Sequence, residues 1–196
     1  MLESQAKDKI LWARFKNGDP AALEKIYMEQ FQSMYYYGLK IHNETELVKD
    51  SIQELFAEIW SKRKNLGETT SIKFYLLKSI KRKIIKRVNK LNPISSISDL
   101  DEQYNFVVQY SIEHEIINND ISQEQTQNLK NALNELSDRQ REIIYLRFNQ
   151  GLNFDEISEI MSIKNQSARN LLFEGVAKLK TILVSSLVVC FQFLRV

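Results

Sequence analysis

The sequence predicts an all-α protein with two small helical domains joined by an acidic linker, the second of which contains a helix-turn-helix. Gly and Pro are scarce, at 5 and 2 of 196 residues. A β-sandwich or barrel needs a turn about every ten residues, and a dinucleotide-binding fold needs glycines. Apolar residues recur instead at the three-to-four spacing of buried helix faces. Helices joined by polar segments are the architecture that this composition favours.

Charge is sorted along the chain, although the formal net charge is only +2. Residues 61–90 carry 11 basic side chains and one acid, whereas residues 91–129 carry seven acids and neither Lys nor Arg. A cationic stretch of this density favours a polyanionic partner or an anionic surface. A solvated helix face is the alternative interpretation.

Five helices are expected in the first domain: one near 4–16, a second that starts at Pro20, and three over about 31–41, 44–64 and 72–89. The second begins at Asp19-Pro20, where Asp caps the helix and Pro occupies its first position. The fourth places Leu47, Ile52, Leu55 and Ile59 on one side, with acidic and polar residues on the other.

The fifth helix repeats apolar residues every four positions from Ile72 to Val88 and turns its cations elsewhere. Gly67 and the following Thr-Thr-Ser precede this helix, and Asn92-Pro93 ends it. Gly38 and Gly175 fall inside expected helices, where the pattern gives no reason for them.

We expect the first domain to span residues 1–92, the linker 93–126 and the second domain 127–196. Ser137 and Gln140 form a capping-box pattern, and Gly151 marks the end of the helix that they begin.

Residues 153–183 predict the helix-turn-helix. Asn153 and Glu156 form a second capping pattern for a helix over 154–161, and a tight turn at Ser162-Ile163 leads into a helix over about 165–183. The second helix would expose polar side chains in its first turns, where they can reach base edges in a major groove. Two helices of an ordinary bundle are the alternative.

Catalytic and metal chemistry find little support. The single cysteine, Cys190, excludes an intramolecular disulfide and fits a reducing compartment. Glu113-His114-Glu115 is better explained as part of an acidic linker than as a metal site. No nucleotide-binding or metalloprotease motif occurs, and no signal peptide is recognisable at the N-terminus. We therefore expect a cytoplasmic protein that is not an enzyme and needs no cofactor or metal.

Two sets of motifs resemble the extracytoplasmic-function group of sigma-70 family RNA polymerase sigma factors. The resemblance covers nearly the whole chain. The N-terminal set comprises residues 15–19, 23–27 and 50–60, and the C-terminal set comprises 136–142 and 151–157. The resemblance implies a region 2-like first domain, which binds core polymerase and the −10 element, and a region 4-like second domain, which binds the −35 element.

The resemblance also implies three sets of site residues. Core polymerase would contact Asp50, Gln53, Glu54, Phe56 and Trp60. The melted −10 element would contact Phe74, Tyr75, Lys78, Lys81, Arg82 and Lys83. The duplex −35 element would contact Lys164, Gln166, Ser167, Arg169 and Asn170. Core packing is the alternative for Trp60, Phe74 and Tyr75.

The expected partners are the clamp helices and flap of core RNA polymerase, promoter DNA, and an anti-sigma factor, often membrane-bound in this group. We hypothesise that the acidic linker mimics RNA in a cationic cleft. The uncharged segment 182–194 is too short to span a bilayer, so it either continues the last helix into the core or forms a docking surface. A helix-turn-helix regulator that works without polymerase is the second functional hypothesis.

Overall fold

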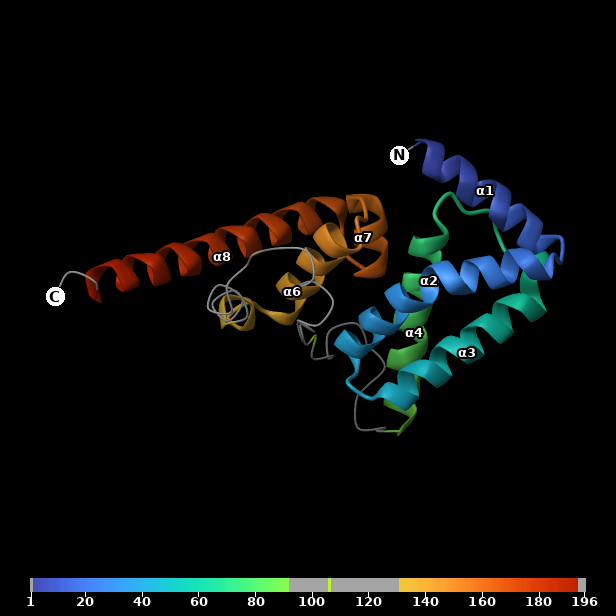
Figure 1. Cartoon of the computed structure of the whole chain (residues 1–196), viewed down its shortest axis with the longest axis horizontal. Coiled ribbons are helices and arrows are strands. Elements are labelled where there is room, and N and C mark those ends of the chain that lie inside the picture. The colour runs from blue at the N-terminus through green and yellow to red at the C-terminus, as the bar shows by residue number, and fades with distance from the viewer. Residues whose placement is uncertain (1, 92–105, 107–130, 194–196) are drawn as a thin grey trace. The chain divides into compact units, whose positions relative to one another are not determined.

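The computed structural model describes residues 2–91, 106 and 131–193, and every regular element within them is a helix (Figure 1). The chain divides into two compact units, Met1–Asn105 and Phe106–Val196. The expected linker, 93–126, lies outside the described residues except for Phe106. In the described part of the chain, no helix has the length and apolar character that crossing a membrane requires.

Unit 1, Met1–Asn105, contains α1 (Leu2–Lys16), α2 (Pro20–Ile41), α3 (Thr45–Lys62), a short 3₁₀ helix (Arg63–Asn65) and α4 (Ile72–Leu91). Helices α2, α3 and α4 pack against one another, and α1 packs on α2. The fully buried side chains of this core include Ile26, Met34, Ile52, Leu76, Ile80 and Ile84.

The sequence predicts a separate third helix that starts near Phe31, and this prediction is wrong because α2 is continuous from Pro20 to Ile41. Asp19 Oδ1 accepts hydrogen bonds from the amides of Ala21 at 2.9 Å and Ala22 at 3.4 Å, as the capping pattern predicts. The intervening polar stretch belongs to the solvent-facing side of one helix, where Met28 is 73% exposed. A polar stretch that contains neither Gly nor Pro is therefore part of the exposed face of a continuous helix here, and it does not end the helix.

Gly38 allows α2 to approach its two neighbours closely. A Cβ atom on Gly38 would lie 2.6 Å from Val48 Cγ1 of α3 and 3.0 Å from Ile84 Cδ1 of α4. Both neighbours are fully buried and leave no space for a methyl group. The glycine that the helical pattern left unexplained thus lies where three helices meet.

The loop between α3 and α4 is fastened to α1. Trp12 Nε1 donates a hydrogen bond to Gly67 O at 2.9 Å, and Lys16 pairs with Glu68. Asp8 Oδ2 accepts from the amide of Ile72 at 2.9 Å and so caps the start of α4. Trp12 is fully buried, so this attachment is part of the core of unit 1.

Unit 2, Phe106–Val196, contains α6 (Asp138–Ile144), a π-helical turn (Tyr145–Asn149), α7 (Phe154–Ile160) and α8 (Asn165–Phe193). Both predicted capping boxes, Ser137 with Gln140 and Asn153 with Glu156, are confirmed. The π-helical turn was not predicted. It follows α6 directly, and the buried Gln150 closes it by donating to the Tyr145 hydroxyl at 2.8 Å. Helix α8 also runs ten residues beyond the expected end at 183.

Phe106 is buried in unit 2, although the sequence places it in the linker. Arg141 Nε donates to Phe106 O at 2.9 Å, and the Phe106 ring lies 5.9 Å from the ring of Tyr145. This residue therefore contributes to the core beneath α6.

Candidate nucleic-acid interface

The helix-turn-helix is present at α7 and α8. Ser162, two residues beyond the end of α7, has a left-handed backbone conformation with φ 53°. The amide of Ile163 then donates to Ser158 O at 3.0 Å, the six-to-one bond of a Schellman motif. Ile157, Met161 and Ala168 are buried where the two helices pack. Arg139 of α6 donates to Met161 O at 3.3 Å and ties the turn to the rest of the unit.

All five side chains predicted to contact the −35 element are exposed at the start of α8: Lys164, Gln166, Ser167, Arg169 and Asn170. Gln166 Nε2 donates to Asn170 Oδ1 at 2.9 Å, and Arg169 Nε donates to Asn165 Oδ1 at 2.9 Å. Side chains that are hydrogen-bonded to their helical neighbours are partly ordered before any ligand binds, which lowers the entropy cost of recognition.

Four residues outside the predicted contact set support this surface. The Arg169 guanidinium lies 4.4 Å from the centre of the Phe154 ring, and the Arg147 guanidinium lies 5.2 Å from the same ring. Asn165 in turn donates to Asp155 Oδ1 at 2.5 Å. Phe154 belongs to the motif 151–157 but lies outside the predicted contact set, because a cation–π contact depends on packing that no local spacing reveals.

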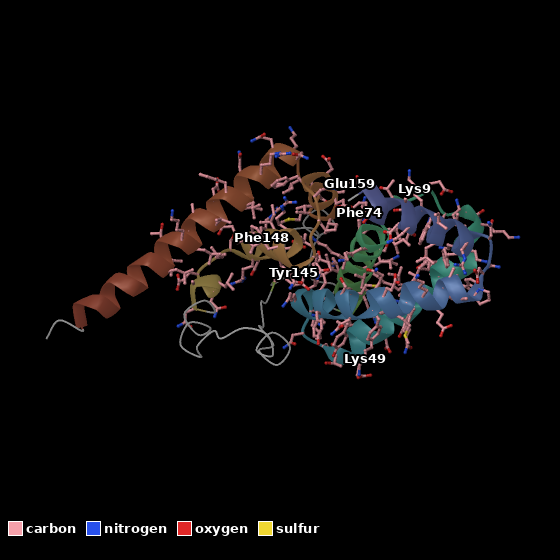
Figure 2. The ribbon with its side chains drawn as sticks, turned by 45° about the horizontal axis from the view of Figure 1, so that its top comes forward. Lys9, Lys49, Phe74, Tyr145, Phe148 and Glu159 are labelled. Carbon is pink, nitrogen blue, oxygen red and sulfur yellow. The ribbon has the colours of Figure 1, made fainter. Side chains whose placement is uncertain are left out.

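In unit 1, the residues predicted to bind the −10 element occupy different environments on α4. Phe74, labelled in Figure 2, is half-buried. The Lys78 ammonium lies 5.5 Å from the centre of its ring. The ring of Tyr75 lies 5.0 Å from that of Trp12, and burial raises the pKa of the Tyr75 phenol. Arg82 is exposed, but Lys81 is only 3% exposed. The structure therefore does not present Lys81 as a surface contact, because its helix position lies beside the core residue Ile80.

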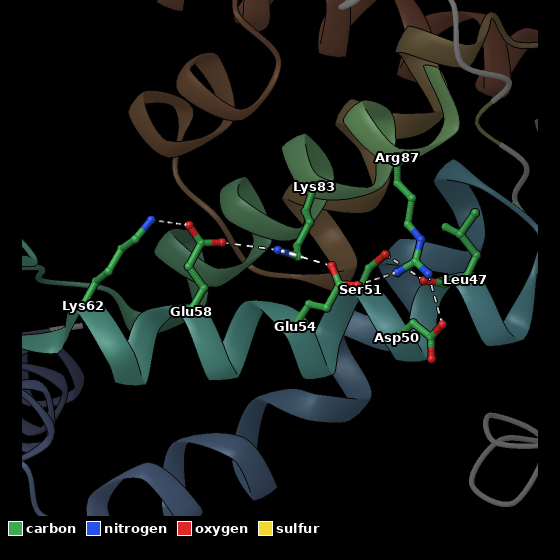
Figure 3. Close-up of polar contacts among 8 residues, drawn as sticks. All are labelled: Leu47, Asp50, Ser51, Glu54, Glu58, Lys62, Lys83 and Arg87. Atoms are coloured by element: carbon green, nitrogen blue, oxygen red, sulfur yellow. Dashed lines mark hydrogen bonds and ion pairs between the residues drawn. The ribbon is translucent and has the colours of Figure 1, made fainter. Parts of the chain in front are cut away.

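Acids of α3 and cations of α4 form a row of ion pairs (Figure 3). The Arg87 guanidinium lies 3.1 Å from both Asp50 and Glu54. The Lys83 ammonium lies 3.6 Å from Glu54 and 3.2 Å from Glu58. These residues, Asp50, Glu54, Glu58, Lys83 and Arg87, are called the α3–α4 ion-pair row below.

Within the row, neighbouring cations shift the pKa of Glu58. Hydrogen bonds from Lys62, at 2.7 Å, and from Lys83, at 3.2 Å, hold the pKa of the Glu58 carboxyl below its ordinary value. The same Glu58 raises the pKa of the Lys62 ammonium. Glu58 and Arg87 were outside the predicted site. The signal that could have identified them is the four-residue spacing of Asp50, Glu54 and Glu58.

The residues predicted to contact polymerase occupy two environments on α3, because Asp50 and Glu54 pair with α4 whereas Phe56 and Trp60 face α2. Asp50, Gln53 and Glu54 are exposed, whereas Phe56 is buried at 7% exposure. Phe56 and Trp60 help line an open hollow of about 330 Å³ between α2 and α3, together with Pro20, Leu23, Glu24, Tyr27 and Ala57. The Arg63 guanidinium lies 4.3 Å from the Trp60 ring, which is partly exposed.

Unit 2 also exposes large apolar side chains. Phe148 of the π-helical turn is 68% exposed (Figure 2), and Phe173 and Val176 of α8 are 76% and 41% exposed. Among the described residues, no group of His, Cys, Asp and Glu is arranged to hold a metal ion.

The comparisons with known proteins agree with this geometry. Residues 132–181, which include α6, α7 and the first part of α8, match the family model of sigma-70 region 4. None of the curated proteins matches the chain by sequence.

Two solved structures share the fold. The sigma factor RpoE of Bartonella quintana, in complex with the anti-sigma factor NepR, has 16% identity and a TM-score of 0.55. This match covers 82% of the present chain and 95% of that one. CnrH, in complex with the cytosolic domain of CnrY, has 16% identity and a TM-score of 0.58, with 91% and 97% coverage. The all-helical fold predicted from the sequence is confirmed.

Proposed function

We propose that the chain is an RNA polymerase sigma factor of the extracytoplasmic-function group of the sigma-70 family, because residues 132–181 match the family model of sigma-70 region 4. In this role it binds core polymerase, directs it to a set of promoters and carries out no chemical step of its own. The observation that carries the proposal is the helix-turn-helix of α7 and α8, which lies inside the region 4 match and exposes polar side chains on its second helix.

Unit 2 would read the −35 element as duplex DNA. The first turns of α8 carry the side chain types that recognise base edges in the major groove: Arg pairs with guanine, and Asn or Gln pairs with adenine. Arg169 is braced by Asn165 and Phe154, so its guanidinium is oriented before DNA arrives. Lys164 and Ser167 would contribute phosphate contacts that fix the register of the helix on the groove.

Unit 1 would bind core polymerase through α3 and the melted −10 element through α4. Trp60, beside the open hollow, supplies the large aromatic contact typical of interface hot spots, and Gln53 and Asp50 supply the polar rim. Phe74 offers a ring face for an unstacked base, with Lys78 beside it for the backbone. The segment 93–126 would connect the two activities.

An anti-sigma factor is the further partner that we propose, and we place it at the membrane, with the chain itself in the cytoplasm. One structural neighbour is in complex with the anti-sigma factor NepR, and the other is in complex with the cytosolic domain of CnrY. Phe148, Phe173 and Val176 give unit 2 an apolar surface of the kind that protein partners cover.

A reconstituted transcription assay tests the function. The purified chain is mixed with core polymerase and a genomic promoter library, and the transcripts are sequenced. We expect a discrete set of transcripts that depends on the chain. Gln53→Arg, which places a cation in the exposed face of α3, should abolish these transcripts without reducing binding of unit 2 to duplex DNA. Transcripts that are the same with and without the chain would refute the proposal.

The same variant separates this function from that of a polymerase-independent regulator. A regulator of that kind binds its operator as a dimer and needs nothing from the exposed face of α3. Full regulatory activity of the Gln53→Arg variant would favour the regulator. As a matched control, Gln32→Arg places the same charge on the exposed side of α2 and should leave transcription unchanged.

A further inference from the structure

The cations in the second half of α4 separate into two rows. The first row, Lys83 and Arg87, faces α3, and its side chains are 21% and 32% exposed because they pair with the acids of the α3–α4 ion-pair row. The second row, Arg82, Lys86 and Lys90, is exposed and forms no ion pair with another described residue. We call Arg82, Lys86 and Lys90 the outer row.

The outer row continues a line that begins at the start of the helix. Phe74, Lys78, Arg82, Lys86 and Lys90 are spaced four residues apart throughout. Four residues rise about 6 Å along an α-helix and turn about 40° around its axis, so the line winds around α4 over about 24 Å. It starts with an aromatic ring and a neighbouring ammonium, 5.5 Å apart, and ends with exposed cations.

We infer that the outer row binds the phosphate backbone of promoter DNA and that Lys83, which the sequence assigns to DNA, has an intramolecular role. The inference rests on the proposed function and specifies its DNA contacts. It adds Lys86 and Lys90 to the predicted set and removes Lys83 and the buried Lys81.

Electrostatics favours the outer row over the paired one. A phosphate that approaches Lys83 or Arg87 must compete with carboxylates 3.1–3.6 Å away and is repelled by them. A DNA phosphate that approaches Lys86 or Lys90 meets an exposed cation. Neutralising that phosphate releases counterions condensed on the DNA, which favours binding. The line also suits a single strand, since it combines a ring for base stacking with cations that follow the backbone.

The salt dependence of DNA binding by the full-length chain tests the inference. Fluorescein-labelled DNA of mixed sequence, single-stranded and duplex, is titrated at several salt concentrations with the wild type and with K86Q/K90Q. Each phosphate contact contributes about 0.9 to the slope of log K against log salt for duplex and about 0.7 for a single strand. K86Q/K90Q, which loses two contacts, should therefore lower the slope by about 1.8 for duplex DNA and by about 1.4 for single-stranded DNA.

Two charge-matched variants serve as controls. K83Q/R87Q removes two cations from the paired row of the same helix, and K9Q/K64Q removes two exposed lysines elsewhere in unit 1. Both should lower the slope by less than about 0.5, because neither removes a proposed phosphate contact. An unchanged slope for K86Q/K90Q overturns the inference, as does an equal loss of slope for K83Q/R87Q.

Binding to core polymerase is measured for the same variants. Wild-type affinity for polymerase in K86Q/K90Q, together with the reduced slope, supports both the inference and the proposed function. A reduced slope in a chain that binds no polymerase would contradict the proposed function and leave the outer row as a DNA-binding surface.

Discussion

The Lys83 ammonium lies 3.6 Å from a carboxylate oxygen of Glu54, although the sequence assigns Lys83 to promoter DNA and Glu54 to polymerase. Both residues belong to the α3–α4 ion-pair row. One carboxylate cannot offer its full charge to an external partner while it holds a cation of its own chain. The row therefore couples the two proposed surfaces of unit 1, and its strength can be measured.

Glu58 makes the stability of unit 1 depend on pH. Its pKa is lower in the folded chain than the unfolded value of 4.5, so the stabilisation is present above pH 4.5 and is lost as pH falls through the folded pKa. We expect the wild type to lose stability more steeply than E58Q between about pH 5 and pH 3. Because the side chain is 46% exposed, E58Q should cost less than about 1 kcal/mol at pH 7.

Urea unfolding at several pH values measures this difference. E29Q, which removes a carboxylate of similar exposure, 51%, is the control. Equal acid slopes in E58Q and the wild type would contradict the role of Glu58.

Gly38→Ala should destabilise unit 1 by about 1–3 kcal/mol. Alanine is the better helix former by about 1 kcal/mol, but the added methyl would lie 2.6 Å from Val48 Cγ1 in a fully packed core. The G38A/V48A double variant should be more stable than the sum of the two single losses predicts, because the shorter side chain removes the clash. Thermal or denaturant unfolding measures both, and strictly additive losses would argue against this contact.

Ser162→Gly should stabilise unit 2 by about 0.5–1 kcal/mol. A non-glycine residue in the left-handed region costs about 1–2 kcal/mol, and the greater freedom of glycine in the unfolded chain returns about 0.5–1 kcal/mol. Ser162→Ala keeps the Cβ atom and should bring no gain.

Gly151 allows the opposite test, in which a Cβ atom is added to a glycine that has a left-handed backbone conformation. It has φ 71°, and a Cβ atom there would meet nothing within 4 Å, so Gly151→Ala isolates backbone strain from packing. It should destabilise unit 2 by about 1 kcal/mol. A stabilising Gly151→Ala would refute the argument at both positions.

Phe154→Leu should weaken binding to −35 duplex DNA about two- to fivefold. Leucine keeps the bulk of the side chain but removes the ring face beneath Arg169, a contact worth about 0.5–1 kcal/mol. Fluorescence anisotropy with a duplex from a promoter that the chain selects measures the loss. Phe148→Leu, at a ring that is 68% exposed, is the control and should bind as the wild type does.

Local signals predicted most of the fold. The Asp19 cap and both capping boxes are side-chain patterns within three residues of the backbone groups they bind, so they can be read from the sequence alone. The continuity of α2 could not be read in this way. A run such as Met28-Glu29-Gln30 is equally compatible with a loop and with an exposed helix face, and only packing on both sides of it decides.

The candidate sites were predicted less completely than the fold. Helical spacing brought out the exposed residues of α8, but spacing gives no radial position for a cation next to a core residue, so Lys81 was placed at the surface when it is buried. The pairing of Lys83 and Arg87 depends on how α3 lies against α4. That arrangement is a tertiary property, and no local pattern contains it.

The contacts between α1 and the loop before α4 connect the first helix to the start of α4, more than fifty residues along the chain. Asp8, Trp12 and Lys16 are spaced four residues apart on α1. Asp8 accepts from the Ile72 amide, Trp12 donates to Gly67 O, and Lys16 pairs with Glu68. A shortened chain that lacks these three residues would lose the buried Trp12 from the core of unit 1 and would leave the start of α4 without its cap from Asp8. Helix α1 is thus a structural support for α4, the helix that we propose to bind the −10 element.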